Sequence, residues 1–173
     1  MRKLLFILVA AFILQGGQFH SASAQVNQVR LRVDGLACSF CAYGLEKKLK
    51  KLDGVKKVTV ALNKGMVALE GKEGHSFSFT KIETLVKDAG FTLRECLVTA
   101  EGVVQKSGDG FALAVTGANE KIILENNEKL TKLLTLLGDS QKPVEVRGSL
   151  LQKSTISSQE KHSTLSIEWF KVK

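Results

Sequence analysis

Two cysteines separated by two residues, Cys38 and Cys41, constrain this chain more than any other feature of its sequence. Before them, residues 28–33 alternate polar side chains with valine or leucine, which predicts a half-buried strand. After them, apolar residues recur at helical spacing. We therefore expect Cys38 in a strand-to-helix loop and Cys41 in the first turn of the helix.

The start of a helix suits reactive sulfur. Unpaired backbone N–H groups and the helix dipole there favour a thiolate over a thiol. Two neighbouring thiolates suit a soft metal ion such as Cu(I), Hg(II) or Zn(II), so we predict Cys38 and Cys41 as the metal ligands. The same spacing occurs in redox dithiols, which leaves a thiol-disulfide oxidoreductase as an alternative, with Cys38 as nucleophile and Cys41 as resolving thiol. A protein-interaction module with a locked disulfide is the third reading.

The helix after the cysteines has two dissimilar sides. Apolar residues form one stripe, lysines occupy the opposite side, and Asp53-Gly54 ends the helix. The apolar positions are Ala42, Leu45, Leu49 and Leu52, and the lysines are Lys47, Lys48, Lys50 and Lys51.

A hairpin, a second helix and a further strand follow. Alternation predicts two strands within residues 57–70, joined by a tight turn at residues 63–65. The run Thr-Lys-Ile-Glu at residues 80–83 fits a capping box that starts the helix, and the last strand ends at Leu97. The order strand, helix, strand, strand, helix, strand over residues 28–97 predicts an α+β ferredoxin-like sandwich.

This segment resembles a heavy-metal-associated domain, as found in copper chaperones, metal-transporting ATPases and periplasmic mercury-binding proteins. The resemblance rests on GLACSFC at residues 35–41, which is similar to the family pattern G-M-x-C-x-x-C. It also rests on LDGV at residues 52–55 and on DAGF at residues 88–91. The resemblance implies that Cys38 and Cys41 carry the metal.

The resemblance also assigns roles to neighbours of the two cysteines. Leu36 stands where the family has a buried methionine, so it is expected to support the loop from the core. Phe91 matches a position that closes over the metal loop. Phe40 and Tyr43 add aromatic bulk, which we expect to pack against the loop and the helix.

Cys96 is the third cysteine. It lies out of phase with the apolar residues of its predicted strand, five residues beyond Phe91. Five strand residues span about 16 Å, so we expect no third ligand from Cys96 but a spare thiol at a domain junction.

Residues 1–24 have the features of a secretory signal peptide. Arg2 and Lys3 precede an apolar run over residues 4–14, and Ala22-Ser23-Ala24 forms a cleavage site. We expect a periplasmic or secreted protein that does not span the membrane once processed. The whole chain has a net charge of +8, so the loss of Arg2 and Lys3 leaves +6. Export argues against nucleic acid, which leaves an acidic protein partner or a merely solubilising charge.

Residues 98–173 predict a second domain after the metal domain of residues 25–97. Three strands are followed by a helix that begins at Asn126 or Asn127 and ends at Gly138, and two more strands follow. This order predicts a small OB-fold-like β-barrel. We expect a structural or protein-docking role for it, because its few aromatic residues offer little for stacking on bases.

Together these features predict an exported protein that carries or scavenges a soft metal ion and is not an enzyme. The thiolates of Cys38 and Cys41 would hold Cu(I) or Hg(II), with Zn(II) as a further candidate, in a near-linear site. A membrane metal transporter or another exported protein would take the ion by ligand exchange.

Overall fold

The computed structural model describes residues 26–72, 75, 78–115, 121–153 and 162–173. The predicted signal peptide therefore lies outside the described residues. Within these ranges, no helix has the length and apolar character needed to cross a membrane.

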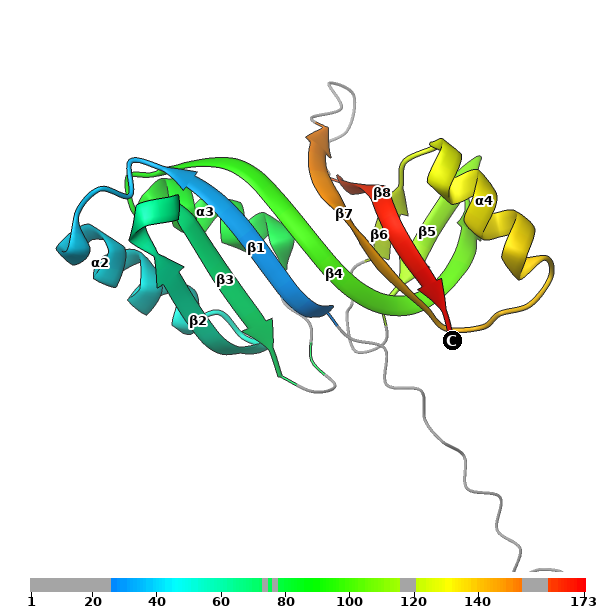
Figure 1. Cartoon of the computed structure of the whole chain (residues 1–173), viewed down its shortest axis with the longest axis horizontal. Coiled ribbons are helices and arrows are strands. Elements are labelled where there is room, and N and C mark those ends of the chain that lie inside the picture. The colour runs from blue at the N-terminus through cyan, green and yellow to red at the C-terminus, as the bar shows by residue number, and fades with distance from the viewer. Residues whose placement is uncertain (1–25, 73–74, 76–77, 116–120, 154–161) are drawn as a thin grey trace, which may run out of the picture.

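The first part of the chain forms a four-stranded antiparallel sheet with two helices on one face (Figure 1). Its elements are β1 (Val26–Asp34), α2 (Ser39–Lys50), β2 (Val55–Ala61), a 3-10 turn (Leu62–Lys64), β3 (Met66–Gly71), α3 (Phe79–Asp88) and β4 (Thr92–Ser107). The strand order β2-β3-β1-β4 places the first and last strands side by side. The order of elements predicted from the sequence is confirmed.

The second part closes into a five-stranded barrel. Its further elements are β5 (Gly110–Ala114), β6 (Lys121–Leu124), α4 (Glu128–Leu137), β7 (Val144–Lys153) and β8 (His162–Val172). The strands follow the order β4-β5-β6-β8-β7, and β7 pairs back with β4 to close the barrel. All pairings are antiparallel except the one between β6 and β8. The predicted C-terminal barrel is therefore present.

One strand belongs to both parts. The sequence predicts that the last strand of the first domain ends at Leu97 and that a second domain begins at residue 98, but β4 runs across this boundary without a break. Its start pairs with β1, its end pairs with β5, and residues 97–100 pair with β1 on one edge and with β7 on the other. No proline or turn residue separates Leu97 from Thr99, so nothing local stops the strand. The four-stranded sheet of the first part and the barrel of the second part thus share β4.

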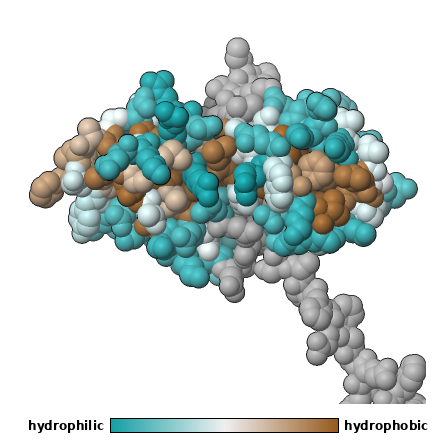
Figure 2. Space-filling view, in the orientation of Figure 1, coloured by the Kyte–Doolittle hydropathy of each residue, from teal (hydrophilic) through white to brown (hydrophobic). Residues whose placement is uncertain are grey.

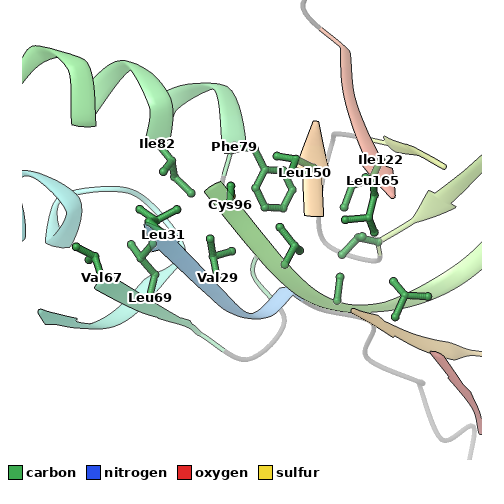
Figure 3. Close-up of a cluster of buried hydrophobic side chains, with 14 of the residues drawn as sticks. Val29, Leu31, Val67, Leu69, Phe79, Ile82, Cys96, Ile122, Leu150 and Leu165 are labelled. Atoms are coloured by element: carbon green, nitrogen blue, oxygen red, sulfur yellow. The ribbon is translucent and has the colours of Figure 1, made fainter. Parts of the chain in front are cut away.

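A bulge in β4 changes which of its side chains face the core. Arg32 lies opposite Glu95 but Val33 lies opposite Leu93, so one extra residue is inserted in β4. Such an insertion reverses the alternation beyond it. Cys96 is consequently buried, with 6% of its surface exposed, and Figure 3 shows it beside Phe79 in the core. The prediction that Cys96 lies out of phase with the core was wrong.

The two later helices begin at side-chain caps. Ser78 precedes α3, and its Oγ accepts a hydrogen bond from the N–H of Lys81 at 3.4 Å. The capping box predicted at residues 80–83 was wrong, because the helix starts earlier and buries Phe79. Asn127 caps α4 as predicted, and its Oδ1 accepts a hydrogen bond from the N–H of Leu130 at 2.9 Å.

Candidate metal site

The loop between β1 and α2 is anchored to the hydrophobic core by Leu36. Gly35 has φ +86°, a conformation that favours glycine, and its carbonyl accepts a hydrogen bond from the N–H of Ala37 at 2.8 Å. Between them, Leu36 is buried with 5% exposure. The buried position expected for Leu36 is confirmed, and it anchors the segment that leads to the first cysteine.

Cys38 is the N-cap residue of α2. Its backbone is extended, and its Sγ accepts a hydrogen bond from the N–H of Cys41 at 3.4 Å. The Cys38 carbonyl accepts the N–H of Ala42 at 3.0 Å. Cys38 therefore ends the loop and Cys41 lies in the first turn, as the sequence predicts. Both side chains are exposed free thiols.

The two thiols have different acidities. The pKa of Cys38 is lowered, first because the Cys41 side chain hydrogen-bonds to its sulfur and then because the Cys41 N–H does the same. The pKa of Cys41 is raised, because its thiol hydrogen-bonds to Cys38, loses some hydration and lies beside the negative charge of Cys38. The first turn of α2 carries no acidic side chain to oppose a thiolate. The two sulfurs are thus close enough to interact, and a soft cation could bind between them.

The described part of the chain adds no third ligand to this pair. No group of three histidine, cysteine or acidic side chains comes close enough there to hold a metal ion. Cys96 is buried in the core, and burial raises its pKa to about 12, which keeps it protonated. Among the described residues, this site therefore has the two sulfurs of Cys38 and Cys41 as donors.

Two interactions connect the end of β1 and the loop after it with the start of β4 and the residue before it. A side chain built on Gly35 would meet the Phe91 ring at 3.5 Å, so this ring lies against the loop as expected. At the end of β1, Asp34 forms an ion pair with Arg94. Sequence reasoning missed this pair, because the residues lie 60 positions apart and the bulge in β4 decides where Arg94 points.

Phe40 and Tyr43 do not pack as predicted. Phe40 is 89% exposed and Tyr43 is 64% exposed. The buried face of α2 is formed by Ala42, Leu45 and Leu49, and residues 40 and 43 lie off that face. Figure 2 shows apolar surface over the start of α2, at the end of the molecule that carries the cysteines.

The first part of the chain is similar to known proteins. Residues 30–92 match the family model of the heavy-metal-associated domain. No curated protein matches the chain.

Similar solved structures include a CopZ metallochaperone, which is 25% identical over 39% of this chain and 98% of that protein, with a TM-score of 0.36. The yeast copper transporter domain CCC2A is 25% identical over 42% of this chain and 93% of that domain, with a TM-score of 0.35. A copper binding domain from a P-type ATPase is 26% identical over 39% of this chain and 90% of that domain, with a TM-score of 0.33.

Proposed function

We propose that this chain, whose residues 30–92 form a heavy-metal-associated domain, is a carrier, chaperone or scavenger of one soft metal ion. The ion would lie between the thiolates of Cys38 and Cys41. The observation that carries the proposal is the pair of exposed free thiols at the start of α2, inside the matched segment, where the Cys38 sulfur accepts a hydrogen bond from the Cys41 N–H.

The donor set favours some metals over others. Two thiolates satisfy Cu(I) or Hg(II), which are soft ions that accept few ligands. Zn(II) prefers four tetrahedral ligands, so a two-sulfur site suits it less well. The lowered pKa of Cys38 makes this residue the first sulfur to bind, and Cys41 follows once the ion displaces its proton.

An exposed two-coordinate ion is also open to transfer. A thiolate of a partner would bind the ion as a third ligand, and Cys41 would then release it and take up a proton. The metal keeps its charge and oxidation state throughout, so the exchange requires no oxidant or reductant. A membrane metal transporter or another exported protein would be the acceptor.

We propose the remaining features as context for this activity. Residues 1–24 would direct export and then be removed. The barrel would be of the OB type, because its third and fifth strands, β6 and β8, pair in parallel and α4 lies between its third and fourth strands. Its role would be structural or protein docking.

Native mass spectrometry of the reduced chain without residues 1–24 tests the metal site. Titration with Cu(I), Hg(II) and Zn(II) should give one bound ion per chain, with Zn(II) the weakest. The double variant Cys38→Ser/Cys41→Ser should bind none, and Cys96→Ser should bind like the natural sequence, because Cys96 is buried. A reduced protein that binds no soft ion would overturn the proposal.

The lowered pKa of Cys38 also fits a redox dithiol, which is the second candidate. Such an enzyme would accelerate the reduction of insulin disulfides by dithiothreitol, and Cys38→Ser would abolish the acceleration. A carrier would show no acceleration above that variant. The assay therefore separates the two functions without reference to metal affinity.

A further inference from the structure

A groove of about 530 Å³ lies between α2 and α3, on the helical side of the metal domain. Leu52 and Leu85 contribute apolar walls. Leu52 is 8% exposed, and Leu85 is half-buried at the edge of the core. The volume falls in the range of about 300–1,000 Å³ that ligand sites usually have. An occupant would bring an apolar side chain to cover these leucines.

Lysines border the groove on both helices. Lys48 and Lys51 come from α2 and its end, and Lys81 comes from the first turn of α3. Lys48 Nζ donates a hydrogen bond to the carbonyl of Asp88 at 2.7 Å, so it lies at the last residue of α3. That position places its charge near the second helix.

Two aspartates, Asp53 and Asp88, also line the groove, and each takes part in a hydrogen bond with a nearby residue. Asp53 accepts a hydrogen bond from the N–H of Gly54 at 2.9 Å and so stabilises the turn after α2. Asp88 lies next to Lys48. Three lysines and two aspartates line the groove, so its lining carries a net charge of +1.

The ammonium groups of Lys51 and Lys81 form no ion pair or hydrogen bond with any residue that the structure describes. Lys81 also lies in the first turn of α3, where the helix dipole favours an anion over a cation. Lys81 therefore does not stabilise α3 through the helix dipole. An external anion would interact favourably with both ammonium groups.

We propose that this groove binds an acidic amphipathic segment of a partner protein. An apolar side chain of the segment would cover Leu52 and Leu85, and carboxylates on either side of it would pair with Lys51 and Lys81. A single-headed lipid carries its charge at one end, whereas this groove presents free cations from two helices. A peptide with several carboxylates matches that arrangement, and the net charge of the chain has the complementary sign.

This site is separate from the metal-binding loop. None of its lining residues belongs to the loop of residues 35–41 or to the first turn of α2. A partner held in the groove would leave both thiols exposed. The inference therefore does not depend on the proposed metal activity.

Amide chemical shifts in the full mature chain, followed by NMR, test the groove. The probe is an acetylated twelve-residue peptide of glutamate and leucine, with leucine at helical spacing. The largest shifts should fall on Leu52, Lys81 and Leu85. Two control peptides, with glutamine for glutamate or serine for leucine, should each bind at least about tenfold more weakly, because the groove needs both charge and an apolar side chain.

Charge reversals on the same two helices provide a matched control. Lys51→Glu/Lys81→Glu should weaken the peptide at least about tenfold, because attraction becomes repulsion. Lys47→Glu/Lys87→Glu makes the same change in net charge on the same helices and should weaken the peptide clearly less than Lys51→Glu/Lys81→Glu, because neither side chain lines the groove and exposed charges are partly screened by salt. Cys38→Ser/Cys41→Ser should bind the peptide like the natural sequence, even if it binds no metal.

Several results would overturn the proposal. Equal weakening by the two lysine pairs would mean that net charge alone attracts the peptide. Shifts that cluster away from the groove, or no binding at millimolar peptide, would also refute it. Binding to phosphatidylglycerol vesicles through Lys51 and Lys81 without peptide binding would assign the groove to a lipid surface instead.

Discussion

Replacing Gly148 by alanine should destabilise the protein strongly, because β7 and β8 leave no space for a side chain there. A Cβ at Gly148 would lie 2.0 Å from the carbonyl oxygen of Ser166 and 3.1 Å from the Cα of Ile167. Real Cβ atoms essentially never approach closer than 3.0 Å, so the strands must separate by about 1 Å. The obstructing atoms are backbone and cannot rotate away. Overpacking costs about 1–3 kcal/mol, and we expect about 3 kcal/mol here.

Calorimetry of the chain without residues 1–24 measures this cost. A loss of about 3 kcal/mol corresponds to a fall in Tm of about 6–12 °C for a chain of this size. Residues 97–100 of β4 are paired with β1 and β7 at once, so both parts should unfold in one transition. Gly110→Ala is the matched control in the barrel, because a Cβ there meets nothing within 4 Å.

Two outcomes would refute this reasoning. A Gly148→Ala variant that melts within about 1 °C of the natural sequence would contradict the steric argument. A separate transition in which the metal domain melts at its original temperature would contradict the shared role of β4.

Three further predictions concern the helices and the thiols. Gly44→Ala should raise the stability by about 0.5–1 kcal/mol in urea unfolding, because Gly44 lies inside α2 with nothing within 4 Å of an added Cβ; unchanged or lower stability would contradict this. Asn127→Ala should cost about 1–2 kcal/mol in the same assay, because the cap of α4 and the hydrogen bond to the Ile167 carbonyl are lost, and a neutral effect would contradict it. Iodoacetamide near neutral pH should label Cys38 before Cys41, because a lower pKa gives more thiolate. It should leave Cys96 unlabelled until the chain unfolds. Peptide mass spectrometry would show the order of labelling, and labelling of Cys41 before Cys38 would refute the assigned acidities.

The metal loop could be predicted from the sequence because its signals are local. Strand alternation ends at Val33 and the helical period begins at Ala42. The cysteines between them must therefore lie in the loop or in the first turn of the helix. The same helical period could also have predicted that Phe40 and Tyr43 are exposed, because it places both residues off the apolar stripe. The expectation that they pack was wrong because it weighed residue type above position.

The features that sequence reasoning missed depend on distant partners. The burial of Cys96 follows from a bulge against β1, and no local pattern in β4 marks the extra residue. The continuity of β4 likewise depends on β1, β5 and β7, which supply its hydrogen bonds along different stretches. The lysines of α2 are evident in the sequence. Their position beside Lys81 and the groove could not be predicted, because it depends on how α2 and α3 pack together.

The coordination of the bound ion tests the central claim most directly. X-ray absorption spectroscopy of the chain without residues 1–24 and with Cys96→Ser, loaded with one Cu(I), would count the ligands of the ion. The account predicts two sulfur ligands, from Cys38 and Cys41, and loss of the Cu(I) signal when both are replaced by serine. Copper held by nitrogen or oxygen ligands, or retained without both cysteines, would contradict it.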